Sequence, residues 1–276
     1  MRFVILNYHI FKNAGMSLEE ILDRNFGERF TRFDAPDRNA RVDNTWLLSF
    51  LTRNPHLQAI SSHQIRYPVP AASGFVFFDA CFLRDPLDRV RSMYDYVREK
   101  PDERDPLSDL ALNLDLSGFV ERMLSDMPDW ICDVQTRLLA GRGTPVDTRL
   151  DRAMQTMLRT SFLGVVDRFE ESLTAGEFFL RAAFPGLRCR TAVVNASRGL
   201  EGTLEDRKRR LREACGEILY KDLVHRNASD LQLVERARLE VERRFRIASA
   251  ESSRPPGLEA DRILSFRKSD VAVLAR

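Results

Sequence analysis

The chain has 276 residues, of which 43% are hydrophobic and 30% are charged, a composition typical of a folded globular protein with a large core. Its 43 basic and 41 acidic residues leave a net charge of +2, which argues against a nucleic-acid binder but leaves room for a local basic pocket. The four cysteines form no CxxC pair and the four histidines show no metal-ligand spacing, so we expect no metal site.

The start of the chain carries no targeting signal. The first predicted strand begins almost at Met1, without the basic region and cleavage site of a secretory signal. No apolar run approaches the ~20 residues that are needed to cross a bilayer. We therefore expect a cytoplasmic protein with no membrane span, in which the cysteines stay reduced.

The predicted elements alternate between strands and helices. Apolar runs that suit buried strands occur at Phe3–Leu6, Leu57–Ser61, Phe75–Leu83, Phe162–Val166 and Ala192–Val194. Helical periodicity is found at residues 17–26, 45–53, 86–99, 117–125, 128–140, 151–158 and 169–183. The segment 100–113, rich in Asp, Pro and Ser, is predicted to be a loop. The alternation predicts an α/β fold with a parallel β-sheet of about five strands flanked by helices.

The C-terminal part has a different character. From about residue 203 the sequence is charged, with predicted helices at 205–220 and 229–248. We expect these helices to pack on the sheet, so that residues 1–250 form a single α/β domain with a helical C-terminal part over 203–250. The run RKRR at 207–210 is interpreted as a solvated helix face rather than a ligand site. Residues 251–276 are predicted to be a tail, flexible or docked on a partner.

The turn after the first strand carries a chemical signal. Residues 9–17 read HIFKNAGMS, so a strand leads through a turn with a lysine and a glycine into the start of a helix. Unpaired backbone N–H groups and the helix dipole attract phosphate at such a point, and Lys12 and Ser17 would add a charge and a hydroxyl donor. Lys12 precedes the only glycine, Gly15, so the turn is P-loop-like but is not a Walker A motif. The alternative is an ordinary turn that binds no ligand.

A second signal follows the longest predicted strand. Residues 83–94 read LRDPLDRVRSMY. Arg84 stands at the carboxyl end of the strand, where ligands bind in open α/β sheets, and a guanidinium can contact phosphate in bidentate fashion. Ser92 lies about two helical turns further on. The alternative is that Arg84 pairs with Asp85 or Asp88. Together, two anion sites at neighbouring strand ends suit a nucleotide that is phosphorylated at both ends.

Both segments resemble motifs of the sulfotransferases that use 3′-phosphoadenosine 5′-phosphosulfate (PAPS). Residues 9–18 are similar to the turn HIPKTAGTS of carbohydrate sulfotransferases, including the heparan sulfate 2-O type, and of related bacterial enzymes. Residues 83–94 are similar to their segment LRDPxxRxxSxY, with the Arg-to-Ser spacing intact. Further similarity occurs at QTRLLAG (135–141), GVVDRFEESL (164–173), NASR (195–198) and DLQL (230–233). The resemblance covers roughly residues 3–240 in the same order.

The resemblance implies a donor site. The 5′-phosphosulfate of PAPS would be bound by the turn residues Lys12, Asn13, Ala14, Gly15, Met16 and Ser17. The 3′-phosphate of PAPS would be bound by Arg84 and Ser92. PAPS would be the co-substrate and adenosine 3′,5′-bisphosphate the product, and Lys12 would stabilise the leaving phosphate without a metal. The chain departs from the family pattern at Phe11, Asn13 and Met16, where Pro, Thr and Thr are usual; Asn13 still offers an amide donor, whereas Met16 offers only its backbone N–H.

The reaction also needs a base. Residues 61–67 read SSHQIRY and follow the second predicted strand, where the glycan-sulfating relatives carry a Gly-His segment with a catalytic histidine. His63 aligns with that histidine, although Ser62 replaces the usual glycine. An ordinary pKa near ~6.5 suits a general base at neutral pH. The alternative is a structural histidine, and His9 is expected to shape the turn.

These features predict an enzyme, a PAPS-dependent sulfotransferase that sulfates a hydroxyl on a glycan or a small molecule. The lack of a membrane anchor favours a bacterial cytoplasmic enzyme. Two alternatives stay open: a nucleotide-dependent kinase that uses the same turn for ATP, and a catalytically silent nucleotide-binding protein. The missing Walker spacing counts against the first alternative. The presence of Lys12, His63 and Arg84 counts against the second.

Overall fold

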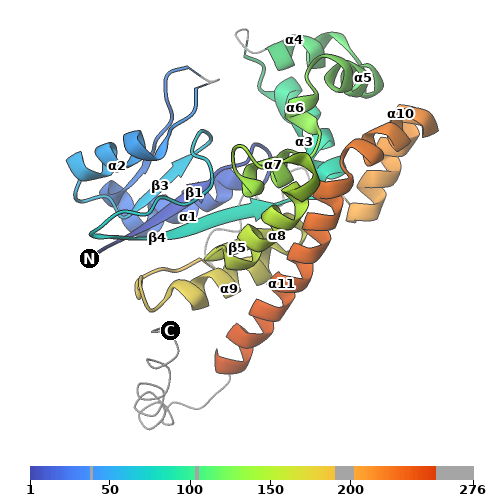
Figure 1. The fold of residues 1–276 in the computed structure, drawn as a ribbon. Coiled ribbons are helices and arrows are strands. Elements are labelled where there is room, and N and C mark those ends of the chain that lie inside the picture. The colour runs from blue at the N-terminus through green and yellow to red at the C-terminus, as the bar shows by residue number, and fades with distance from the viewer. Residues whose placement is uncertain (38–39, 103–105, 190–201, 253–276) are drawn as a thin grey trace.

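The computed structural model describes residues 1–37, 40–102, 106–189 and 202–252 (Figure 1). In these residues five parallel strands form one sheet in the order β2-β3-β1-β4-β5, and helices flank it. The predicted α/β fold, with its parallel sheet and helical C-terminal region, is confirmed.

The strands are β1 (Arg2–Tyr8), β2 (Phe30–Arg32), β3 (Ala59–Ser62), β4 (Phe75–Leu83) and β5 (Phe162–Val165). Four of them match predicted strands, whereas β2 was not predicted. It is a three-residue edge strand with no fully buried side chain, so its sequence shows no apolar run. The predicted strand at Ala192–Val194 lies outside the described residues.

Six helices lie close to their predicted positions. They are α1 (Gly15–Phe26), α2 (Asn44–Arg53), α3 (Pro86–Glu99), α5 (Leu116–Asp126), α8 (Arg149–Arg159) and α9 (Phe169–Leu180). Three short 3₁₀ turns, η1 (Gly27–Arg29), η2 (Val146–Thr148) and η3 (Val166–Arg168), precede β2, α8 and α9. The carboxylate of Asp85 caps α3 by accepting hydrogen bonds from the N–H groups of Leu87 and Asp88, at 3.0 and 3.3 Å.

Two helical predictions were wrong. The segment predicted as a loop contains α4 (Pro106–Asn113), whose Leu107 and Ala111 are buried against the neighbouring helices. The helix predicted over 128–140 is divided into α6 (Pro128–Ile131) and α7 (Val134–Ala140). The break lies at Asp133, which has a left-handed φ of 45° and accepts a hydrogen bond from the Asp230 N–H at 2.9 Å. A long-range contact therefore overrides the local helical periodicity.

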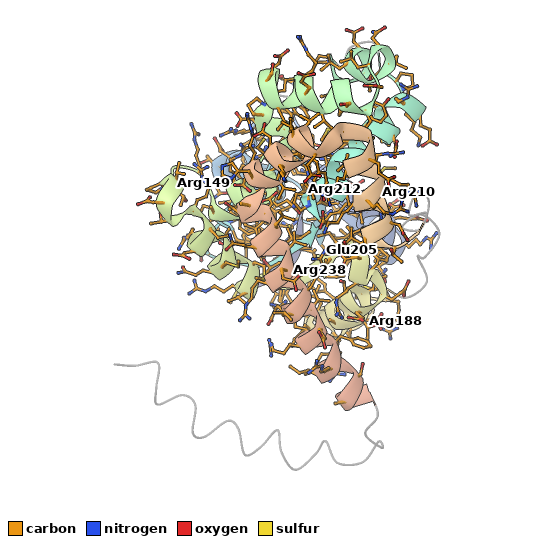
Figure 2. The ribbon with its side chains drawn as sticks, turned by 90° about the vertical axis from the view of Figure 1, so that its right-hand side faces the viewer. Arg149, Arg188, Glu205, Arg210, Arg212 and Arg238 are labelled. Carbon is orange, nitrogen blue, oxygen red and sulfur yellow. The ribbon has the colours of Figure 1, made fainter. Side chains whose placement is uncertain are left out.

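The two C-terminal helices pack on the sheet domain, as expected. Helix α10 (Leu204–Arg226) contacts α3 and α5, and it bends at Gly216, where φ is 72°. Helix α11 (Ala228–Ser252) runs along α9, α8 and β5, and its buried residues Leu233 and Val241 belong to the core on one face of the sheet. Figure 2 shows the face formed by these helices.

The core is divided by the sheet. Alternate residues of β1 point to opposite faces: Leu6 packs with α2, α7, α8 and α11, whereas Ile5 packs with α1 and α9. A third apolar cluster joins α3, α4, α5 and α10. Across the described segments, no helix is long and apolar enough to span a bilayer.

Candidate functional site

The carboxyl ends of β1, β3 and β4 lie next to one another, because these parallel strands are neighbours in the sheet. The chain leaves β1 and β4 toward opposite sides at this edge, which is where open α/β sheets bind ligands. The turn after β1, the segment after β3 and the start of α3 therefore meet there. They carry Lys12, His63 and Arg84 respectively.

The turn between β1 and α1 is held in a strained conformation. Lys12 and Ala14 have left-handed φ values of 67° and 57°, which cost roughly 1–3 kcal/mol each for residues with a Cβ. Within the part of the chain that the structure describes, the N–H groups of Ala14, Gly15 and Met16 have no acceptor, and neither does the Ser17 hydroxyl. This geometry leaves the donors at the start of α1 available to an anion.

The Lys12 ammonium lies over an aromatic ring rather than against a carboxylate. Its Nζ is 3.9 Å from the centroid of the Tyr96 ring on α3. No ion pair to Lys12 occurs in the described segments. Burial, followed by the positive charge of Arg84, lowers the pKa of Lys12 to about 8. An anion bound at the turn would meet a partly desolvated cation whose charge is offset only at a distance, by Glu99 and Asp95, which raise its pKa.

Asn13 does not offer the donor expected of it. Its side chain is buried and points into the protein, where Nδ2 donates to the Phe82 carbonyl at 2.9 Å and to Oε1 of Gln135 at 2.7 Å. Its backbone N–H donates to the Ile10 carbonyl at 3.1 Å. All its donors are therefore used inside the protein, and Asn13 fixes the turn to the end of β4 instead of binding phosphosulfate.

Gln135 on α7 is the centre of a buried polar network. Its Oε1 accepts hydrogen bonds from Asn13 and from the Arg84 N–H, and its Nε2 donates to the Arg84 carbonyl at 2.8 Å and to Asp230 at 3.1 Å. Asp230, at the start of α11, also accepts the Gln135 and Thr136 N–H groups at 3.1 and 2.7 Å. Gln135 and Asp230 belong to the segments 135–141 and 230–233, which resemble the sulfotransferase family. Through these hydrogen bonds they hold Asn13 of the turn and the backbone of Arg84 in place.

Arg84 is buried and already has protein partners. Its Nε donates to Asp88 at 2.8 Å, as in the alternative interpretation of the sequence, and its Nη1 donates to the Lys12 carbonyl at 3.0 Å. Its Nη2 has no partner among the described residues and is not fully enclosed. Arg84 thus lies against the Lys12 turn through this hydrogen bond.

Asp88 also pairs with a residue that was predicted from the sequence to lie on a solvent-exposed helix face. Arg207 on α10 is paired with Asp88 at 2.6 Å, and its side chain is only 11% exposed. The interpretation of the basic run as a solvated face is therefore wrong for Arg207. It holds for Arg209, which is 61% exposed and pairs with Glu213. No local pattern distinguishes the two, because the partner of Arg207 is distant in sequence.

Ser92 lies on the same face of α3 as Tyr96, one helical turn before it. It is half-buried, and its hydroxyl has no partner in the described ranges. Because Tyr96 contacts the Lys12 ammonium, this face of α3 is turned toward the turn after β1. Ser92 is thus brought to the same region as Lys12 and Arg84.

His63 follows β3 and lies against His9. Its Nδ1 donates to the His9 carbonyl at 2.9 Å, and the two ring centroids are 3.8 Å apart. A carbonyl can only accept, so the neutral ring carries its proton on Nδ1 and its lone pair on Nε2. Burial of the ring face, followed by the charge of His9, lowers the pKa of His63. At neutral pH the imidazole is neutral and can accept a proton at Nε2.

Glu19 on α1 is a site residue that the sequence interpretation missed. Its carboxylate is buried and accepts hydrogen bonds from His9 at 2.8 Å, Ser61 at 2.7 Å and Arg32 at 2.6 Å. Burial raises the pKa of this carboxyl, but the hydrogen bonds outweigh it and lower the pKa to about 2. The available signal was its position between Leu18 and Leu22 on the buried face of a helix.

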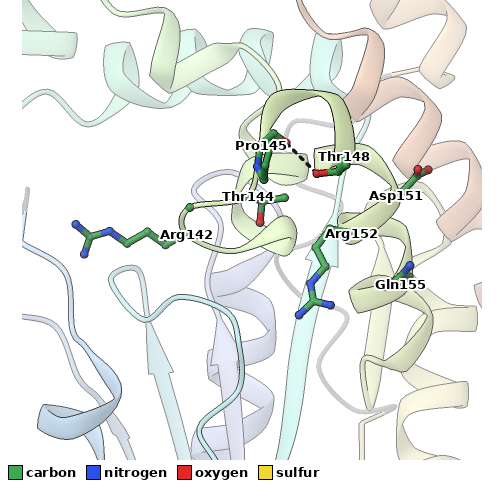
Figure 3. A pocket seen from close by; sticks show the side chains of 8 residues that line it. Arg142, Thr144, Pro145, Thr148, Asp151, Arg152 and Gln155 are labelled. Carbon is green, nitrogen blue, oxygen red and sulfur yellow. Dashed lines mark hydrogen bonds between the residues drawn. The ribbon is translucent and has the colours of Figure 1, made fainter.

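Two pockets lie away from this edge. One of about 530 Å³ lies between the loop after α7 and helix α8 (Figure 3); Arg142 and Arg152 on its rim point in different directions. The other, of about 620 Å³, lies at the junction of α10 and α11. Neither is lined by Lys12, His63 or Arg84. The described residues contain no cluster of three or more potential metal ligands.

Fold and site together define an α/β protein with a cationic turn and a histidine at the carboxyl edge of a parallel sheet. No protein-family model matches the chain. It is 27% identical over 242 residues to an uncharacterized protein of Archaeoglobus fulgidus, and the match covers 85% of this chain and 96% of that protein. The similarity extends along nearly the whole relative and carries no activity with it.

Proposed function

We propose that the protein is a sulfotransferase that transfers a sulfuryl group from PAPS to a hydroxyl of a glycan or a small molecule in the cytoplasm. One observation carries the proposal. In the part of the chain that the structure describes, a single edge of the sheet carries a lysine without a carboxylate partner, a set of unpaired helix N–H groups and a neutral histidine whose Nε2 has no partner. These are the groups that sulfuryl transfer needs.

The donor would bind at the turn through its 5′-phosphosulfate. The N–H groups of Ala14, Gly15 and Met16 and the Ser17 hydroxyl would donate to its oxygens. Arg84 Nη2 and the Ser92 hydroxyl would be left for the 3′-phosphate. Asn13 acts indirectly, by fixing the turn to β4.

In the reaction, the acceptor oxygen attacks sulfur and forms a new S–O bond. The S–O bond to the 5′-phosphate breaks, and the leaving phosphate keeps the electron pair as part of adenosine 3′,5′-bisphosphate. Lys12 would stabilise the charge that develops on that phosphate. The acceptor proton would pass to Nε2 of His63, a contribution that is typically worth about 10²–10⁴-fold in rate.

Two measurements test the proposal. Adenosine 3′,5′-bisphosphate should raise the melting temperature, because a ligand at 100 times its Kd stabilises the native state by about 2.7 kcal/mol. ATP with Mg²⁺ serves as the comparison. Transfer of ³⁵S-labelled sulfate from PAPS is then measured against a panel of glycan and small hydroxyl acceptors. A larger shift with ATP–Mg²⁺ would favour a kinase; binding without transfer to any acceptor would favour a silent binding protein.

A further inference from the structure

The base of the proposed reaction lies against a second histidine, His9, which is in turn hydrogen-bonded to a buried glutamate, Glu19; the reaction as written gives neither of them a part. We propose that His9 and Glu19 are positioning residues: Glu19 fixes the His9 side chain, and His9 fixes the ring of His63 so that its Nε2 faces the reacting hydroxyl. This inference rests on the proposed function and deepens it.

His9 holds His63 at two points. The His9 carbonyl accepts the Nδ1 proton of His63 at 2.9 Å, which fixes both the tautomer and the rotation of the ring. The His9 ring covers one face of the His63 ring, with the centroids 3.8 Å apart and the planes tilted by 31°. The backbone N–H of His63 donates to Asp34 at 2.8 Å, so the main chain is fixed as well. His63 is exposed, and its Nε2 has no partner among the described residues, so this nitrogen is left for a substrate.

His9 is itself held by contacts on both sides of its ring edge, from Glu19 and from Gly15. Its Nδ1 is hydrogen-bonded to Glu19 at 2.8 Å, and the ring lies directly on the backbone of Gly15. A Cβ at position 15 would lie 2.0 Å from Nε2 of His9, so even an alanine would displace the ring. Glycine at the start of α1 is therefore explained by the packing of His9.

Glu19 is anchored by neighbours from two strands. Ser61 on β3 and Arg32 on β2 donate to its two oxygens, and Asn7 on β1 donates to Ser61 at 2.9 Å. A buried carboxylate with three donors has a single orientation. Residues of the sheet thus fix the position of His63 indirectly, by way of Glu19 and His9.

The charges around His63 act in opposite directions. Burial and the charge of His9 lower its pKa, whereas the carboxylates of Asp34 and Glu19 raise it, and lowering prevails. Arg66, in the same segment, directs its guanidinium to the carbonyls of His63 and Ile65. Removing the His9 ring should therefore raise the pKa of His63 toward ~6.5.

The experiment uses His9→Asn, because an Asn side chain can still donate to Glu19 while it uncovers His63. ¹⁵N-resolved NMR titration of the histidine rings is the first readout. In the wild type we expect the Nδ1–H tautomer at His63; in His9→Asn we expect its pKa to rise, whereas exchange of the exposed His56 for Asn leaves it unchanged. An Nε2–H tautomer in the wild type, or an unchanged pKa in His9→Asn, would overturn the proposal.

The second readout is kinetic. Glu19→Gln should lower kcat on the order of tenfold to a hundredfold, as displaced positioning groups do, and leave the Kd for adenosine 3′,5′-bisphosphate unchanged. The acid limb of the pH–rate profile in His9→Asn should move to higher pH together with the NMR value. An equal loss of kcat and nucleotide affinity would mean a general structural role and refute the inference. If the wild type binds no bisphosphate, the proposed function fails, while the NMR titration still decides whether His9 controls His63.

Discussion

Replacement of Gln135 by alanine tests whether the buried network holds the site together. The side chain is fully buried and bonds both the N–H and the carbonyl of Arg84, at 2.9 and 2.8 Å. In Gln135→Ala both groups lose the only partners that the described residues give them. Asn13 keeps the Phe82 carbonyl, and Asp230 keeps two backbone donors. A buried group left without a partner costs about 1–3 kcal/mol, and water entering the space recovers part of this. We therefore expect a loss of about 2–4 kcal/mol.

The assay is urea unfolding followed by circular dichroism, with the m-value as a check that the unfolded states are comparable. Gln155→Ala is the matched control, because Gln155 is an exposed residue of a helix and its loss should change stability by less than about 0.5 kcal/mol. The affinity for adenosine 3′,5′-bisphosphate should fall in Gln135→Ala, since both the Lys12 turn and Arg84 are attached to this side chain. Equal stabilities for the two variants would refute the role given to the network.

Three further predictions concern the site. His63→Ala should lose about 10²–10⁴-fold in turnover in the ³⁵S assay and keep its affinity for the bisphosphate. Arg84→Ala should bind the bisphosphate more weakly in calorimetry. The opposite pair of results would contradict the roles given to these residues. The pKa of Lys12 is lowered to about 8, so its positive charge is lost as the pH rises through that value. Calorimetry should therefore show the affinity for the bisphosphate falling toward alkaline pH in the wild type but not in Lys12→Arg, whose guanidinium stays charged. Parallel pH profiles for the two proteins would exclude Lys12 as a ligand of the bisphosphate. The Glu19 carboxyl has a pKa of about 2 in the folded protein and ~4.3 in the unfolded chain. The ionised carboxylate therefore stabilises the fold above pH ~4.3, and this contribution is lost as the pH falls toward 2. Urea unfolding should show that Glu19→Gln is less stable than the wild type at about pH 7 and that the difference disappears in acid.

The buried strands of the fold could be predicted because a parallel sheet covered on both faces needs continuous apolar runs. Strand β4, with its run from Phe75 to Leu83, is the clearest case. The edge strand β2 could not be found in this way, since among the described strands it pairs with β3 alone and it is half-exposed. The break at Asp133 could not be found either, because it is stabilised by Asn227 and Asp230, about a hundred residues away in sequence.

For the site, Lys12, His63 and Arg84 could be placed at one edge of the sheet, because each follows a predicted parallel strand. The directions in which the neighbouring side chains point could not be predicted. Asn13 was expected to face a ligand and instead bonds Gln135, which is 122 residues away. Glu19 was not singled out from the sequence, because its partners come from two strands and a turn that are distant along the chain. Such contacts depend on how the elements pack, and a single sequence does not encode them as a local pattern.

The arrangement of charges explains how a nearly neutral chain can present a cationic site. Asp88 is shared by two guanidiniums, those of Arg84 and Arg207, so this group of three side chains carries one excess positive charge. Lys12 adds another, because it has no carboxylate partner in the described ranges. Arg207 comes from α10, which means that the C-terminal helical part contributes to the potential at the edge of the sheet. A buried carboxylate paired with one arginine would be electrically neutral, whereas a second arginine from a distant helix leaves an excess positive charge, which would attract the phosphate of the proposed donor.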